Sequence, residues 1–158
     1  MNSIHELRRI LGTCRTIAVV GLSPQWHRPS FFAAKYMQAH GYTVIPVNPS
    51  ATEILGERCW PSVTEAAKHH RIDMVDCFRK TEDIGPIADE AIAAGAKCLW
   101  QQLGVLNQAA HDKALAAGLD AVMDRCVKIE HARLFGGLNW AGVNTKVISA
   151  RRPQQLFY

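Results

Sequence analysis

The chain of 158 residues has no long apolar run. No stretch approaches the roughly 18 uninterrupted apolar residues that a membrane helix needs. Its first sixteen residues, MNSIHELRRILGTCRT, lack the apolar core and the small-residue cleavage site of a secretory signal. We therefore expect a cytoplasmic protein with no membrane partner.

The sequence also has no closely spaced pair of cysteines. The five cysteines are an odd number, are spread widely and include no CxxC pair. A disulfide framework or a zinc site would need a more regular spacing, so we expect reduced thiols and no metal. The cysteines are Cys14, Cys59, Cys77, Cys98 and Cys126.

Acidic residues are absent between Leu7 and Thr52. This part of the chain carries five bases, whereas residues 53–130 carry thirteen acids and nine bases. From His131 onward there are four bases and no acids, and the whole chain has a net charge of +4. An acid-free first unit favours an anionic ligand there, although chance clustering on solvated surfaces would produce the same distribution.

Short apolar runs alternate with helical stretches along the chain. We predict strands over residues 16–21, 42–47, 74–78, 98–101 and 119–123. We predict helices over residues 31–40, 62–70, 81–94 and 107–117. This alternation indicates an α/β fold: a Rossmann-like, doubly wound, mainly parallel five-stranded sheet with helices on both faces. Pro46 is expected to release the end of the second strand near the ligand crevice.

The length fits one domain. We assign residues 1–134 to this domain and residues 135–158 to a C-terminal extension. The extension is rich in glycine and asparagine and shows no clear period. We expect it to dock on the domain or to be partly mobile.

The loop after the first predicted strand, GLSPQWHRPS at residues 21–30, has features of a phosphate site. Ser30 is a good N-cap for the next helix, and a helix start presents unpaired backbone N–H groups. Arg28 adds a planar fork of donors beside it. An ordinary capped helix with a surface arginine would show the same pattern.

The dinucleotide fingerprint GxGxxG is absent, since Gly21 is the only glycine of this loop. After the second predicted strand, where NAD-binding proteins usually carry Asp or Glu, the chain has Asn48. A neutral residue there tolerates a phosphorylated ribose. Both features weigh against NAD.

Several motifs follow one another along the chain: GLSP with RPS, VIPVNP, EILGERCW, MVDCFR, EAIAAGAKCLWQQLGV and VMDRCVKIEH. In this order and spacing they resemble the bacterial family of small stand-alone CoA-binding proteins of the YccU type. That family is similar in turn to the CoA-binding domain of the succinyl-CoA synthetase α subunit. The resemblance covers residues 5–134, and the ligase's second domain has no counterpart in this chain.

The resemblance implies that coenzyme A or an acyl-CoA lies across the strand ends, held by phosphate contacts and without catalysis by the chain itself. Trp26 and His27 stand where the ligase loop is rich in glycine. The implied binding residues are Gly21, Leu22, Ser23, Pro24, Arg28, Pro29 and Ser30 in the first loop, Asn48, Pro49 and Ser50 after the second strand, Phe78 and Arg79 after the third, and Gln101, Gln102 and Leu103 at the fourth.

One alternative is an enzyme that uses Cys126 for thiol exchange or acyl transfer with CoA. Arg125 and a helix start beside this cysteine would lower its pKa. The same segment has a structural interpretation in which no residue is catalytic. In it, Asp124 caps a final helix, Cys126 is buried and Glu130-His131 faces solvent.

A second alternative is a nucleotide- or nucleic-acid-binding module that uses the extension. Lys146, Arg151 and Arg152 supply its basic charge. Nucleic acid needs many basic contacts and the extension has few, so this interpretation is the weaker one. A homo-oligomer is also compatible with the sequence.

Overall fold

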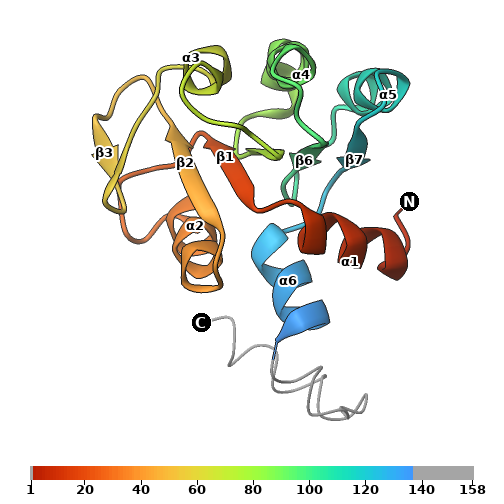
Figure 1. Cartoon of the computed structure of the whole chain (residues 1–158), viewed down its shortest axis with the longest axis horizontal. Coiled ribbons are helices and arrows are strands. Elements are labelled where there is room, and N and C mark those ends of the chain that lie inside the picture. Colours follow the sequence, from red (N-terminus) through yellow and green to blue (C-terminus); the bar gives the residue numbers. More distant parts are fainter. Residues whose placement is uncertain (1, 137–158) are drawn as a thin grey trace.

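Five parallel strands form the central sheet of the computed structural model, which describes residues 2–136. The strands lie in the order β2-β1-β5-β6-β7 (Figure 1). All four neighbouring pairs are parallel, which confirms the predicted α/β, Rossmann-like class. The strands are β1 (Thr16–Val20), β2 (Thr43–Val47), β5 (Met74–Cys77), β6 (Cys98–Gln101) and β7 (Asp120–Val122).

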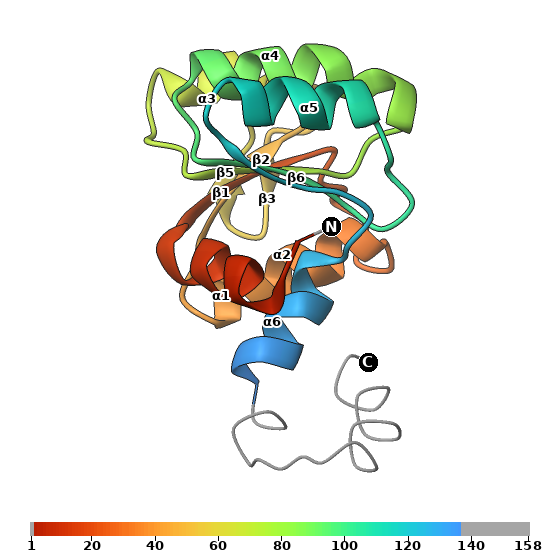
Figure 2. The same cartoon turned by 90° about the vertical axis from the view of Figure 1, so that its right-hand side faces the viewer.

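Helices cover both faces of this sheet. Figure 2 shows α3, α4 and α5 on one face and α1, α2 and α6 on the other. A short 3-10 turn, η1 (Thr81–Asp83), precedes α4. The helices are α1 (Ile4–Thr13), α2 (Pro29–Ala39), α3 (Val63–Ala67), α4 (Ile84–Ala93), α5 (Gln108–Ala116) and α6 (Val127–Phe135).

Two hydrophobic cores form because successive side chains of a strand point to opposite faces of the sheet. In β1, Ala18 and Val20 pack in the core beneath α3, α4 and α5. Ile17 and Val19 pack in the core shared with α1, α2 and α6. The strands are therefore buried on both faces, which explains why they read in the sequence as continuous apolar runs.

Helix α1 and a short hairpin add to the elements that we predict from the sequence. The Ser3 hydroxyl accepts a hydrogen bond from the Glu6 N–H at 3.1 Å, and Leu7, Ile10 and Leu11 form the buried side of α1. This cap and this spacing are visible in the sequence and indicate a helix. The antiparallel hairpin consists of β3 (Glu53–Ile54) and β4 (Glu57–Arg58).

Strand β2 stays paired along its whole length, so the prediction that Pro46 releases its end is wrong. Val47 still pairs with Val20, and its carbonyl accepts a hydrogen bond from the Gly21 N–H at 3.0 Å. Strand β2 is an edge strand, and the missing N–H of Pro46 falls on its outer side. The Pro46 carbonyl accepts a hydrogen bond from the Trp60 N–H at 3.0 Å on that side.

The predicted extension lies almost wholly outside the described residues, so its docking or mobility stays a prediction. Helix α6 runs through Phe135 and thus crosses the predicted domain boundary at residue 134. Within residues 2–136, no helix is long and apolar enough to cross a bilayer.

Gly21 directly follows β1, at the point where the chain comes very close to the segment after β5. Its φ is +85°, and a Cβ added there would lie 2.3 Å from the Phe78 carbonyl oxygen and 3.0 Å from Cδ of Arg79. The position therefore needs both the backbone freedom of glycine and its lack of a side chain. The contact sets the spacing between the loop after β1 and the loop after β5.

Gly21→Ala should lower the free energy of unfolding by at least about 2 kcal/mol, because the positive φ and the Phe78 carbonyl both oppose a Cβ. Gly118→Ala is the matched control, since its φ is +90° but no atom lies within 4 Å of the added Cβ. We expect a loss of about 1 kcal/mol there. Urea denaturation measures both losses, and equal values would contradict the steric role of the Phe78 carbonyl.

Candidate functional site

The carboxyl ends of the five parallel strands meet at one edge of the sheet. The connection that leaves β1 crosses one face through α2, whereas the connection that leaves β5 crosses the other face through α4 (Figure 2). The connections that follow the neighbouring strands β1 and β5 therefore turn to opposite faces of the sheet. In open α/β sheets this switch point is where ligands bind.

A hollow of about 360 Å³, termed the first hollow, opens at the ends of β1 and β2. Ser23, Asn48, Ser62 and Glu90 place polar groups in its wall, and valine, proline and isoleucine side chains form the rest. Its polar groups suit a ligand that carries hydrogen-bonding atoms.

A larger hollow of about 780 Å³, termed the second hollow, opens at the ends of β5, β6 and β7. Its wall is mainly apolar, and its apolar members are Pro29, Phe78, Leu103, Val105 and Ile129. Arg79 and Asp83 line both hollows, so the two spaces adjoin at these residues.

Nine of the fifteen residues that the resemblance implies line these hollows. They come from loops after four different strands, and the parallel sheet brings them to one edge. The first hollow receives Gly21, Ser23, Asn48, Pro49 and Arg79. The second receives Pro29, Phe78, Gln102 and Leu103 together with Arg79.

The other six implied residues lie outside both linings. Leu22 is fully buried in the core, and Gln101 is buried with its amide bound to the backbone of Asn107 at 3.0 and 2.8 Å. The backbone N–H of Ser50 donates to Oδ1 of Asn48 at 2.8 Å. Both lining sets omit Leu22, Pro24, Arg28, Ser30, Ser50 and Gln101.

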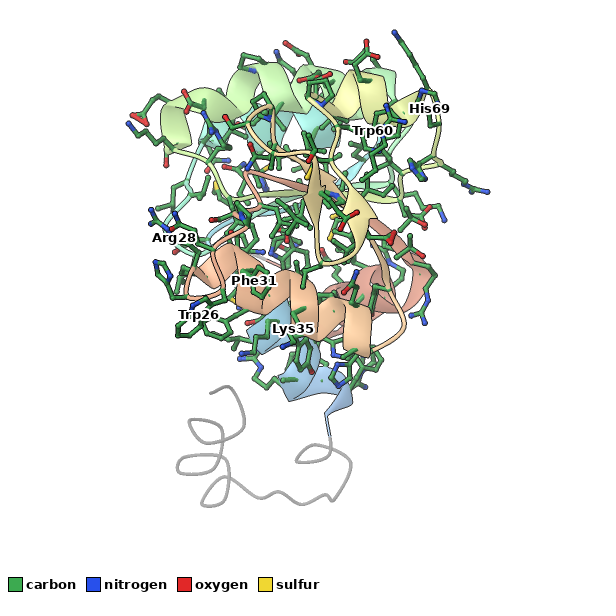
Figure 3. The ribbon with its side chains drawn as sticks, turned by 90° about the vertical axis from the view of Figure 1, so that its left-hand side faces the viewer. Trp26, Arg28, Phe31, Lys35, Trp60 and His69 are labelled. Carbon is green, nitrogen blue, oxygen red and sulfur yellow. The ribbon has the colours of Figure 1, made fainter. Side chains whose placement is uncertain are left out.

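Helix α2 begins two residues earlier than predicted, so the assignment of Ser30 as its N-cap is wrong. Arg28 is the N-cap and Pro29 the first helical residue. The Ser30 hydroxyl instead accepts a hydrogen bond from the Ser23 N–H at 3.0 Å, which ties the loop to the helix. Figure 3 shows Arg28 near the exposed Trp26 at this end of α2.

The start of α3 forms a wall of the first hollow that the sequence-based site did not include. Pro61, Ser62 and Val63 line it. Ser62 is the N-cap of α3, and its hydroxyl accepts a hydrogen bond from the Glu65 N–H at 3.1 Å. Its place beside β2 is a tertiary contact, so no local pattern in the sequence signals it.

The bases of the acid-free segment lie mostly away from the hollows. Arg9 pairs with Asp120 at 2.8 Å, at the amino end of β7. Arg15 precedes β1, and its guanidinium lies 4.7 Å from the ring centroid of Tyr42. None of the five bases lines either hollow, and Arg28 comes nearest in the chain because it adjoins Pro29 of the second hollow.

A buried carboxyl group lies beneath the second hollow. Asp76 of β5 is almost fully buried and accepts a hydrogen bond from Nε2 of Gln102. Burial raises the pKa of Asp76 to about 7, against the opposing effect of this hydrogen bond. Oε1 of Gln102 accepts a bond from the Val127 N–H at 3.4 Å, so Gln102 links the acid to the start of α6.

Asp76→Asn should change how stability depends on pH. The folded-state pKa lies above the usual 3.8, so the wild type loses stability as pH rises through the folded pKa near 7. The stability of Asp76→Asn relative to wild type should increase by about 2–3 kcal/mol between pH 5 and pH 8.

Denaturation at both pH values measures this difference, with the exposed Asp112→Asn as control. A relative stability that stays constant with pH would show that Asp76 titrates in its ordinary range.

Cys126 lines the second hollow and is the N-cap of α6. Burial raises its pKa, and this effect outweighs the backbone hydrogen bonds from Ile129 and Lys128 that lower it. The prediction of a lowered pKa is therefore wrong. Arg125, which the sequence predicts to lower this pKa, instead lies with Nη1 3.6 Å from Oε1 of the buried Glu130.

The structural interpretation of this segment also needs correction. Asp124 does not cap α6; it has a φ of +59° and accepts a hydrogen bond from the Gly104 N–H at 2.7 Å. Glu130 and His131 are buried rather than solvent-facing. Nδ1 of His131 lies 2.9 Å from the Tyr36 hydroxyl, and burial lowers the pKa of His131 to about 4.

Residues 15–132 match the family described as a CoA binding domain. The chain belongs to this family. It is 38% identical over 127 residues to the uncharacterized protein YneT of Bacillus subtilis, which covers 80% of this chain and 93% of YneT.

Solved structures show the same fold. A hypothetical protein from Pyrococcus horikoshii is 40% identical, with a TM-score of 0.82 over 85% of this chain and 94% of that protein. A dinucleotide-forming acetyl-coenzyme A synthetase from Ca. Korarchaeum cryptofilum is 23% identical, with a TM-score of 0.60. The match covers 73% of this chain but 27% of the synthetase, so it shows a shared fold within a larger protein.

Proposed function

We propose that this protein binds coenzyme A or an acyl-CoA across the carboxyl edge of its sheet and performs no covalent chemistry of its own. The observation that carries the proposal is the pair of adjoining hollows, lined by residues that follow all five strands, in a member of the CoA binding domain family. A long ligand with hydrogen-bonding groups at one end and an apolar arm at the other matches this arrangement.

The nucleotide part of the ligand occupies the first hollow. The hydroxyl oxygens of Ser23 and Ser62 accept bonds from the backbone, which leaves their O–H groups free to donate. Asn48 follows β2 in place of the acid that NAD-binding proteins use, so a phosphorylated ribose meets no carboxylate at that position.

The phosphates lie where the hollows join. The loop of residues 21–30 borders the first hollow through Gly21 and Ser23 and the second through Pro29. Pro29 begins α2, and the amino end of a helix attracts anions. Arg79, which lines both hollows, supplies a guanidinium for a charge-assisted hydrogen bond.

The pantetheine arm and any acyl group occupy the second hollow. This hollow is about twice as large as the first, and its wall is mainly apolar. Cys126 lies in the same wall, but its raised pKa keeps the thiol protonated at neutral pH, which argues against thiol exchange. The nucleic-acid interpretation rests on residues 146–152, outside the described part of the chain.

Isothermal titration tests the proposal with CoA, dephospho-CoA, NAD and ATP. CoA should bind more tightly than NAD or ATP. No CoA binding at millimolar concentration, or tighter binding of NAD, would contradict the proposal.

The exposed Leu103 lets the same titration test where CoA binds. Leu103→Glu should weaken the binding of CoA by about tenfold, because it puts a carboxylate into the apolar wall of the second hollow. Leu115→Glu is the matched control, since Leu115 is similarly exposed but lies on α5 and lines neither hollow. Equal affinities of the two variants would place CoA elsewhere.

A further inference from the structure

Arg79 and Asp83 are the two residues that line both hollows. Arg79 follows β5, and its Cδ would lie 3.0 Å from a Cβ at Gly21, so its stem lies against the loop after β1. Asp83 is the last residue of η1 and precedes α4. The pair therefore stands at the join, where the proposed ligand would carry its phosphates.

The two side chains face each other in a weak ion pair. Nη2 of Arg79 lies 3.5 Å from Oδ2 of Asp83, and the side chains are 50% and 40% exposed. A half-exposed ion pair with such a long contact contributes little stability, so the arginine can readily leave it for another acceptor. A phosphate oxygen is a stronger acceptor for a guanidinium because it allows a bidentate, charge-assisted contact.

Within the described residues, the Asp83 carboxylate has no other hydrogen-bond partner than Arg79. Asp83 holds the N-cap position of α4, yet its side chain makes no capping bond. Glu90, the other acid in the first hollow, differs in this respect. Its carboxylate accepts bonds from the backbone N–H and the hydroxyl of Thr64 at 2.9 and 2.8 Å. Of these two carboxylates, Asp83 is therefore the one that pairs with Arg79, whereas Glu90 is bound to Thr64.

We propose that Asp83 sets the affinity of the site by competing with the ligand's phosphates for Arg79. In the empty site Asp83 neutralises the guanidinium. When a phosphorylated ligand binds, its phosphate replaces the carboxylate at Arg79, and the displaced carboxylate turns toward solvent. The site therefore binds more weakly than its arginine alone would allow. This inference rests on the proposed function, because the competitor is a phosphate of CoA.

The test compares Asp83→Asn with wild type by isothermal titration. Asp83→Asn should bind CoA about three- to tenfold more tightly, since the competing charge is gone. Pantetheine, which has no phosphate, should show no gain. Glu82→Gln is the matched control because it removes a negative charge from the neighbouring position of η1, outside both linings. It should change CoA affinity less than twofold.

Arg79→Ala completes a double-mutant cycle. Competition for Arg79 requires that the gain from Asp83→Asn be smaller in the Arg79→Ala background than in wild type. An unchanged or weaker CoA affinity of Asp83→Asn would overturn the inference, and so would an equal gain in both backgrounds. If the wild type still binds CoA in those cases, the proposed function is retained and this inference alone is overturned. Absence of CoA binding by the wild type overturns both.

Discussion

The close approach of Gly21 to the carbonyl of Phe78 fixes the spacing on which the rest of the site depends. Strands β1 and β5 are neighbours, and the chain leaves them toward opposite faces of the sheet. Because no side chain separates their following loops, Arg79 lies directly against the first loop. That position puts one guanidinium on the border of both hollows, where a single extended ligand would pass.

The carboxyl edge combines features that suit different parts of one ligand. The first hollow has the hydroxyls of Ser23 and Ser62 and the amide of Asn48 among its apolar lining residues, whereas proline, phenylalanine and aliphatic side chains form most of the second. Beneath the second hollow, Gln102 connects the buried Asp76 with the start of α6. Buried polar links of this kind hold a wall in place because breaking them leaves a desolvated group without a partner.

Much of the fold follows from local patterns in the sequence. The apolar runs that became β1, β5 and β6 are short, uninterrupted and bounded by turn residues, as strands buried on both faces should be. The motifs that resemble small CoA-binding proteins pointed to the loops after these strands, and Arg79 and Gln102 do line the hollows. Charge was a poor guide to the site, because Arg9 and Arg15 sit at the opposite end of the strands, where Asp120 and Tyr42 engage them. The sequence predicts a lowered pKa for Cys126, whereas burial raises it, because this burial depends on packing that no neighbouring residue in the sequence reveals.

A nuclear magnetic resonance titration of backbone amides with CoA tests whether CoA binds across the carboxyl edge of the sheet. We expect saturable shifts confined to the segments at the carboxyl edge of the sheet, namely residues 21–30, 48–49, 61–63, 78–83, 102–105 and 126–129. Amides of α1 and of the outer face of α5, which lie outside both linings, should not move. Shifts centred on those helices, or no shifts at saturating CoA, would contradict binding across this edge.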